Sequence, residues 1–245
     1  MDAVRVRDSA QVVLKLWSDD PHEVAELSIL RYFSDPSTAN HPSNHSVPLL
    51  EAFPVEGYAD VFDETLVEPL LRDCRQPSWT IAAEIVSFLL QVLEGLEYMH
   101  SQNVAHGDIH LGNILLDARA MFPNGFHGPF NFQPDQRLPE RGIKRLTRLQ
   151  APVKYCYIDF GSGFMFLSFE ARKGARFNAA ALIPPEVLAN REAPFDPFKG
   201  DVWALGFSVV EQLRYRSGLD FLEPAFLTMM EDDPNNRPTP KDAMS

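Results

Sequence analysis

The chain has 245 residues, with 22 basic and 34 acidic side chains and a formal net charge of −12 at pH 7. Its 45% hydrophobic and 23% charged residues are typical of a folded globular protein with one large domain or two small lobes. The acidic balance argues against nucleic acid or an anionic membrane as a partner, because both require clustered Lys and Arg.

The two cysteines, Cys74 and Cys156, have no metal-like spacing, so they support neither a disulfide framework nor a cysteine zinc site. No apolar run is long enough for a membrane span, and the N-terminus lacks the apolar stretch of a secretory signal. We therefore expect a cytoplasmic or nuclear protein.

The first half of the chain predicts strands and one helix. Alternating apolar residues from Val4 to Val6 and the run 12–17 indicate two strands of a hairpin, with Lys15 inside the second strand. An acidic cap and a proline at 20–21 predict a helix to about Phe33. The apolar runs 47–53 and 61–71 predict two further strands.

The second half is more helical. Apolar residues at helical spacing predict a long helix from a cap at Thr80 to Ser101. The polar stretch 72–78 predicts a boundary between an N-lobe, residues 1–72, and a C-lobe, residues 73–245. Residues 117–152 contain several prolines and glycines and little periodicity, which indicates an inserted loop.

Three strings follow the long helix in order: HGDIHLGN at 106–113, YIDFG at 157–161 and DVWALG at 201–206. Together they resemble the motif set of eukaryotic protein kinases. The resemblance covers nearly the whole chain and is greatest to divergent kinase-like proteins of basidiomycete fungi. It implies an α+β bilobal fold, with an antiparallel β N-lobe that looks truncated and a mainly α-helical C-lobe.

The resemblance implies that ATP and Mg²⁺ bind at these strings. Asp108 corresponds to the carboxylate that orients a substrate hydroxyl and accepts its proton. Asn113 and Asp159 correspond to the oxygen ligands of Mg²⁺, a cation that prefers such hard donors. His110 falls within the catalytic loop, at the position where many kinases carry a lysine.

The same resemblance assigns nucleotide contacts in the N-lobe. Lys15 corresponds to the strand lysine that reaches the phosphates, and Glu26 to the helix residue that pairs with it. Glu23, one turn earlier, is a rival partner. A lone strand lysine or helix glutamate is usually solvent-facing, so the spacing to the later motifs carries this assignment.

Four other positions complete the comparison. Glu68 and Leu70, in the predicted strand 61–71, are assigned to the nucleotide site. His106 and Phe160 are interpreted as packed structural residues rather than catalytic groups.

The end of the chain resembles two more kinase strings, IPPEV at 183–187 and NNRPT at 235–239. They predict an ion pair between Glu186 and Arg237, which would be costly to leave half made in the interior. Asp201 is expected to brace the catalytic loop from a helix that runs to Arg214.

Three departures from the kinase pattern bear on activity. The sequence contains no G-x-G-x-x-G string, so we expect weaker nucleotide binding. Gly107 replaces an arginine that reads a phosphorylated segment, so that switch is expected to be absent. A neutral His110 would stabilise phosphate charge less than an ammonium.

The insertion is rich in basic side chains, which could bind an acidic partner or could form an ordinary solvated face. These side chains are Arg137, Arg141, Lys144, Arg145 and Arg148, with Glu140 nearby.

Three functions fit these observations. The first is an ATP-dependent kinase of protein Ser or Thr hydroxyls, whose protein substrate the sequence does not name. The second is a small-molecule kinase, because the string at 106–113 is also similar to aminoglycoside and choline phosphotransferases. The third is a catalytically weak pseudokinase that acts as a binding scaffold, because fold alone does not establish activity.

Overall fold

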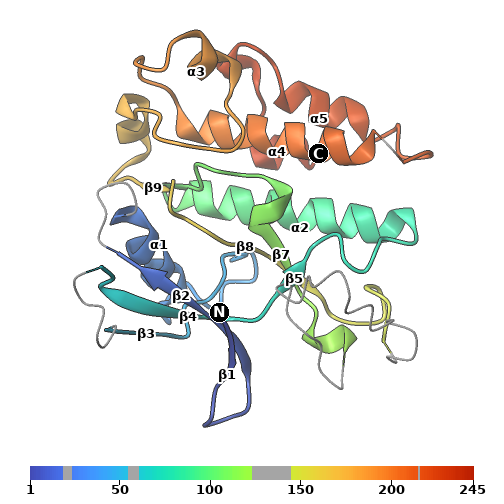
Figure 1. The fold of residues 1–245 in the computed structure, drawn as a ribbon. Helices are drawn as coiled ribbons and strands as arrows, with labels where there is room; N and C mark the ends of the chain where they lie inside the picture. The colour runs from blue at the N-terminus through green and yellow to red at the C-terminus, as the bar shows by residue number, and fades with distance from the viewer. Residues whose placement is uncertain (19–23, 55–60, 123–144, 215) are drawn as a thin grey trace.

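The computed structural model describes residues 1–18, 24–54, 61–122, 145–214 and 216–245. Strands concentrate in the first half of the chain and helices in the second, which confirms the predicted α+β class. In Figure 1 the sheets lie below the two long helices, α2 (Ala82–Ser101) and α4 (Pro197–Leu213). The predicted division at residue 72 stays a prediction.

The N-terminal sheet has four strands in the order β1-β2-β4-β3, and every neighbouring pair is antiparallel. The register places Lys15 opposite Leu66, in the middle of the β2–β4 pair. Lys15 is therefore held by strands on both sides of β2. The strands are β1 (Asp2–Val4), β2 (Gln11–Trp17), β3 (Glu51–Pro54) and β4 (Glu64–Pro69).

Helix α1 (Val24–Ser34) connects β2 to the rest of the sheet. One face of it is almost wholly inaccessible to solvent, as the predicted helical spacing requires: Glu26, Ile29, Leu30 and Phe33. The proposed cap and first turn at 19–23, with the rival Glu23, lie outside the described residues.

Two smaller sheets connect the halves of the molecule. Strands β5 (Arg72–Asp73), β7 (Ile114–Asp117) and β8 (Lys154–Tyr157) form one of them, and β6 (Val104–Ala105) pairs with β9 (Phe164–Met165) in the other. The segments that leave β6 and β8 carry the candidate catalytic strings, so these short pairings bring both strings together.

Helix α2 begins one residue later than predicted. Ile81 precedes the first helical residue and makes no side-chain cap, so the assignment of Thr80 as the cap is wrong. Instead the carboxylate of Glu84 reaches back and accepts hydrogen bonds from Thr80 N (2.7 Å) and Thr80 Oγ1 (3.1 Å). The predicted apolar face packs into the core through Ile85, Phe88, Leu89, Val92, Leu96 and Met99.

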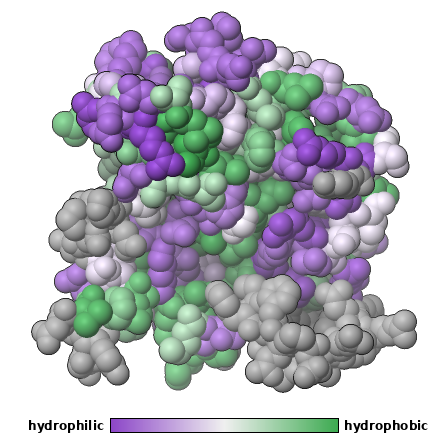
Figure 2. All heavy atoms as spheres, turned by 45° about the horizontal axis from the view of Figure 1, so that its top comes forward, coloured by the Kyte–Doolittle hydropathy of each residue, from purple (hydrophilic) through white to green (hydrophobic). Residues whose placement is uncertain are grey.

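Three further helices lie in the C-terminal part, where α5 packs against α4 and α6 packs against α2. They are α3 (Pro185–Ala189), α5 (Glu223–Met229) and α6 (Pro240–Ala243). Hydrophilic residues dominate the surface of this helical part on the face shown in Figure 2. Within the described residues, no helix combines the length and the apolar character needed to cross a membrane.

The predicted insertion at 117–152 is described only up to residue 122 and from 145 onward, so Arg137, Glu140, Arg141 and Lys144 lie outside the described residues. Arg145 is exposed. Arg148 is only 4% exposed: it donates to the hydroxyl of Tyr155 at 3.1 Å and to the carbonyl oxygen of Pro77. Its guanidinium also lies over the ring of Trp79. Its inclusion in a solvated basic surface is therefore wrong, because the apolar stem and planar head pack well between aromatic rings.

Candidate active site

Lys15 contacts two carboxylates that are far apart in the sequence. Its Nζ lies 2.6 Å from Glu26 Oε1 on α1 and 2.9 Å from Asp159 Oδ1 after β8. The predicted pairing of Lys15 with Glu26 is therefore present. Because the ammonium is anchored from two sides, it has a fixed direction rather than the freedom of a surface lysine.

Lys15 and Asp159 stabilise each other's charged form. Burial lowers the pKa of Lys15, but Glu26 and Asp159 together raise it above its ordinary value. Burial raises the pKa of Asp159, but Lys15 more than offsets this effect and holds it below its ordinary value. A fixed cation beside an exposed carboxylate suits a ligand that carries phosphates and a divalent cation.

Asp159 has an unusual backbone. Its φ is +63°, in the left-handed region that few non-glycine residues adopt. The next residue, Phe160, is fully buried and lies against His106, with ring centroids 5.0 Å apart. The core therefore retains Phe160, and the left-handed turn directs the neighbouring carboxylate toward Lys15.

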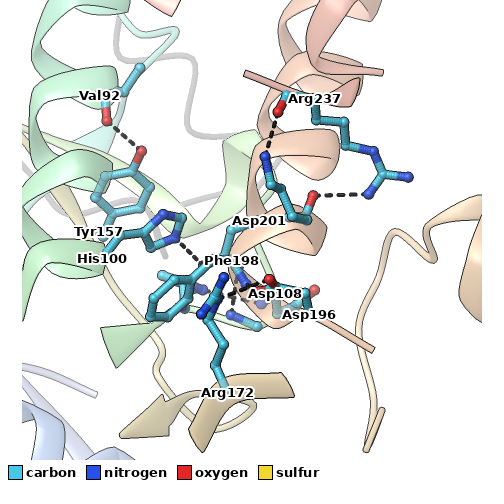
Figure 3. A network of polar contacts seen from close by, with 12 residues as sticks. Val92, His100, Asp108, Tyr157, Arg172, Asp196, Phe198, Asp201 and Arg237 are labelled. Carbon is cyan, nitrogen blue, oxygen red and sulfur yellow. Dashed lines mark hydrogen bonds and ion pairs between the residues drawn. The ribbon is translucent and has the colours of Figure 1, made fainter. Parts of the chain in front are cut away.

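Asp201 holds the catalytic loop from the first turns of α4. Its Oδ2 accepts from the backbone N of His106 at 2.8 Å and lies 3.0 Å from His100 Nε2, while Oδ1 accepts from Gly107 N at 2.9 Å. Figure 3 shows Asp201 between His100 and the loop. The predicted brace is therefore present.

His106 is fully buried and lies next to the contact between Asp201 and the loop. Its Nε2 lies 3.0 Å from the carbonyl oxygen of Ile158, and burial lowers its pKa. These contacts agree with a packed structural histidine. They also connect the catalytic loop to the segment that ends in Asp159.

Gly107 occupies a position that excludes a side chain. Its φ is +79°, and a Cβ placed there would lie 2.0 Å from the carbonyl oxygen of Ser162. An arginine at this position would require the segment after Asp159 to move. The expected lack of a phosphate-reading arginine therefore agrees with the local packing.

Asp108 lies between Asn113 and the segment that precedes α3. Its Oδ1 accepts from the backbone N of Ala181 at 2.6 Å, and Asn113 Nδ2 donates to the carbonyl oxygen of Asp108 at 3.0 Å. Asp108 Oδ2 lies 3.4 Å from the same Nδ2 and 3.8 Å from His110 Nε2. No sequence pattern predicts the Ala181 contact, because a backbone N–H makes it.

His110 turns one ring nitrogen away from the site. Its Nδ1 accepts a hydrogen bond from Gly112 N at 3.0 Å. This backbone contact orients the imidazole ring, whose Nε2 lies on the side of Asp108.

Glu68 shares a face of the sheet with Lys15. Lys15 lies opposite Leu66, and Glu68 follows two residues further along β4, so its side chain projects to the same side. Burial raises the pKa of Glu68 to about 7, against the opposing effect of Lys15. Glu68 thus adds a half-buried carboxyl to the same face of the sheet as Lys15.

Leu70 offers fewer contacts to a ligand than the sequence indicated. Its side chain is 2% exposed within the core, and its backbone N donates to the carbonyl oxygen of Gln11 at 3.1 Å. This backbone donor is already used between the strands. Leu70 therefore provides packing beside the site rather than a free hydrogen-bond donor.

The donors fit a magnesium ion. Asn113 uses its Nδ2 toward Asp108, which leaves its Oδ1 as an oxygen donor, and Asp159 uses only one of its two oxygens toward Lys15. The backbone N of Ile158 donates to the carbonyl oxygen of Asn113 at 3.0 Å. Asn113 therefore lies beside the residue that directly precedes Asp159. Mg²⁺ needs few protein oxygens because it retains water and phosphate ligands. No cluster of three or more His, Cys, Asp or Glu side chains suited to a metal occurs within the described ranges.

The model of the protein kinase domain family matches residues 47–220, which is more than half of the chain. The chain belongs to the protein kinase family. It is 26% identical over 187 residues to serine/threonine-protein kinase 10-A of Xenopus laevis, covering 71% of this chain and 15% of the relative. Over 121 residues it is 34% identical to cyclin-dependent kinase F-1 of rice, covering 46% of this chain and 23% of the relative.

A third kinase relative aligns with almost the whole chain. Serine/threonine-protein kinase 10 of Mus musculus is 22% identical over 249 residues, which cover 95% of this chain and 21% of the relative. The chain thus spans less than a quarter of the length of these three relatives. The similarity identifies a kinase domain and leaves the activity of this chain to be proposed from its own site.

The kinase also contains the ion pair predicted near its C-terminal end. Arg237 donates to Glu186 through Nη1 (2.8 Å) and Nη2 (2.6 Å), and its side chain is fully buried. Nε and Nη1 donate further to the carbonyl oxygens of Glu231 and Lys199. This network fixes the segment before α3, which carries Ala181 to Asp108.

Proposed function

We propose that this kinase transfers the γ-phosphoryl group of ATP, with Mg²⁺, to Ser or Thr hydroxyls of a protein substrate. The observation that carries the proposal is the double anchoring of Lys15 by Glu26 and Asp159, with Asn113 alongside. Phosphoryl transfer depends mainly on positioning and charge stabilisation, which this arrangement is suited to supply.

Each residue has a distinct task in this proposal. Lys15 binds phosphate oxygens, Glu26 keeps the ammonium in place, and Asn113 and Asp159 are the protein oxygens that would hold Mg²⁺. The bound cation would neutralise charge on the transferred phosphoryl group. Asp108 accepts the proton of the substrate hydroxyl.

The contact from Ala181 determines which oxygen of Asp108 receives the substrate. Oδ1 is taken by the backbone N–H, so Oδ2 is the oxygen that faces an incoming hydroxyl. Ala181 then holds the carboxylate in one orientation.

A weaker enzyme or a pseudokinase scaffold is the second candidate, and one observation favours it. His110, whose Nδ1 accepts from Gly112 N, stands where a lysine would place an ammonium near the phosphates. We also propose, from the strings at 106–113 and 157–161, kinship with the divergent kinases of basidiomycete fungi.

A transfer assay with labelled Mg-ATP and casein as the acceptor tests the first candidate. We expect Asp108→Asn to lower the rate by about a hundredfold or more, because it removes the proton acceptor. Asp159→Asn is expected to abolish transfer by weakening the hold on Mg²⁺. Glu64→Gln, which removes a surface pair with Arg31 on α1, is the control and should retain the rate.

The same assay separates the alternatives. Transfer to small amines or alcohols but not to casein would favour a small-molecule kinase. Nucleotide binding without transfer to any acceptor would favour the scaffold. Transfer that survives in Asp108→Asn would contradict the role of Asp108.

A further inference from the structure

A pocket lies in the C-terminal part of the molecule, and neither Lys15 nor Asp108 lines it. Its volume is about 260 Å³. The end of α2, the segment 169–172, the first turn of α4 and the segment 238–240 line it. None of the residues assigned above to nucleotide, magnesium or catalysis is among its lining residues.

Lys199, on the pocket wall, has an ammonium without a carboxylate partner. Its Nζ donates to the carbonyl oxygen of Arg237, and it makes no ion pair with any described residue. An ammonium has three donor protons, so two of them are available. Burial lowers the pKa of Lys199, and Arg237 and Arg172 oppose the effect of Asp196, so an additional anion would be stabilised here.

Arg172 supplies a second cationic group on the same wall. It is only 8% exposed, its Nε donates to Asp196 Oδ2 at 2.9 Å, and its Nη1 donates to the carbonyl oxygen of Phe169 at 2.6 Å. Nη2 has no hydrogen-bond partner among the described residues. Figure 3 shows Arg172 beside Asp196 and Phe198.

The acidic residues of the pocket are already engaged. Asp196 accepts from Arg172 and, at the start of α4, from the backbone N of Phe198 at 3.1 Å. Glu97 accepts from the backbone N of Lys241 at 3.2 Å. The unused capacity for hydrogen bonding on Lys199 and Arg172 is therefore donor capacity, which selects an anion.

Flat aromatic groups form the remaining walls. The rings of His100 and Phe198 are stacked 4.4 Å apart, and the Arg172 guanidinium lies 3.5 Å from the centre of the Phe169 ring. Pro238 and Pro240 add apolar surface. Walls of this kind accommodate the face of a ring.

We infer that this pocket binds a small organic carboxylate with a flat apolar body, the carboxylate against Lys199 and Arg172 and the body among Phe169 and Phe198. The size agrees, because a cavity of about 150 Å³ already admits benzene. The carboxylate takes the free donors, and the ring removes apolar surface from water.

The pocket is also connected to the catalytic loop. His100, one of its lining residues, bonds Asp201 through Nε2, and Asp201 bonds the backbone N of His106 and of Gly107. A ligand against the His100 ring therefore alters the environment of these two amides. Their resonances provide a reporter that does not depend on phosphoryl transfer.

Titration of the whole chain with benzoate, followed by calorimetry and by amide NMR, tests the inference. Saturable binding is expected, with shifts at Phe198 and Gly107. Benzamide, which has the same shape without the charge, should bind about tenfold more weakly. Inorganic phosphate should not reproduce the affinity of benzoate, because it lacks the ring.

Two variants locate the carboxylate. Lys199→Met keeps the apolar stem and should lower benzoate affinity about tenfold. Lys173→Met is the matched control: Lys173 is in the same segment as Arg172 but is exposed, pairs with Glu170 and does not line the pocket. Its affinity should equal that of the wild type.

The wild-type titration decides the matter even if Lys199→Met fails to fold. Absence of saturation at millimolar benzoate, or shifts confined to residues outside the pocket, would overturn the inference. Equal affinity for benzamide would show that no anion is selected. Equal affinity for phosphate would show that the ring contributes nothing.

Discussion

The ammonium of Lys15 lies 2.9 Å from the carboxylate of Asp159, although 144 positions separate the two residues in the sequence. No local propensity produces this contact: it requires β2 to be paired with β4 and the turn after β8 to be left-handed at Asp159. The contact between Lys15 and Asp159 joins the N-terminal and C-terminal parts of the chain. The predictions below follow from that geometry and from the contacts that support it.

Substitution of Glu26 tests the anchoring of Lys15. Glu26→Gln keeps the size of the side chain but removes the charge that lies 2.6 Å from Nζ. We expect kcat/KM for Mg-ATP to fall by about a hundredfold, because Lys15 loses its fixed direction. Steady-state kinetics measures the change. Glu64→Gln, on a surface pair with the same helix, should leave kcat/KM unchanged, and an unchanged Glu26→Gln enzyme would refute the anchoring role.

Substitution of His110 tests the role of this ring in the proposed phosphoryl transfer. His110→Lys replaces the imidazole by an ammonium near Asp108 Oδ2, from which His110 Nε2 lies 3.8 Å away. We expect kcat to rise by about tenfold, since a positive charge stabilises the transferred phosphoryl group. A lower kcat in His110→Lys would show that the histidine has a task of its own.

The buried pair of Arg237 and Glu186 should dominate the stability of the C-terminal part. Glu186→Ala leaves a fully buried guanidinium with only its carbonyl partners, and the free energy of unfolding should fall by about 3 kcal/mol. Urea denaturation measures the loss. Glu170→Ala, which breaks an exposed pair with Lys173, should cause no measurable change. Equal effects of the two substitutions would contradict this account.

Glu68 should make stability depend on pH. Its pKa is raised from 4.5 to about 7 in the folded protein, so the folded state keeps a proton that the unfolded chain has already released. The free energy of unfolding should therefore fall as pH rises from about 4.5 to about 7 and then level off. The loss should be about 2 kcal/mol at most, because solvent partly screens the group.

Glu68→Gln removes this titration. Relative to Glu68→Gln, the wild type should lose stability across the same pH interval, measured by urea denaturation at several pH values. Parallel pH profiles for the two proteins would show that Glu68 has an ordinary pKa.

The sequence was sufficient for the contacts that depend on motif residues. Lys15 with Glu26, Asp201 with the catalytic loop, and Glu186 with Arg237 each join side chains whose identity and order carry the signal. The sequence was insufficient for features that depend on a backbone hydrogen bond or on side-chain packing. Examples are the N–H of Ala181 on Asp108, the start of α2 at Ala82 and the burial of Arg148 between aromatic rings.

The C-terminal pocket was also outside the reach of sequence reasoning. Arg172 and Lys199 are ordinary charged residues in the chain, and only the fold shows that their donors face a space walled by Phe169 and Phe198. The net charge did not indicate an anion site, because the chain as a whole is acidic. An anion site in this pocket could be inferred only after the hydrogen-bond partners of each carboxylate were known.

Calorimetric titration with ATP, in the presence and absence of Mg²⁺, tests the central claim most directly. The account predicts that the wild type binds ATP more tightly with Mg²⁺ than without it, and that Asp159→Asn loses this difference while Lys15→Met weakens binding in both conditions. Equal affinity of the wild type with and without Mg²⁺, or unchanged binding by both variants, would contradict the assignment of this site.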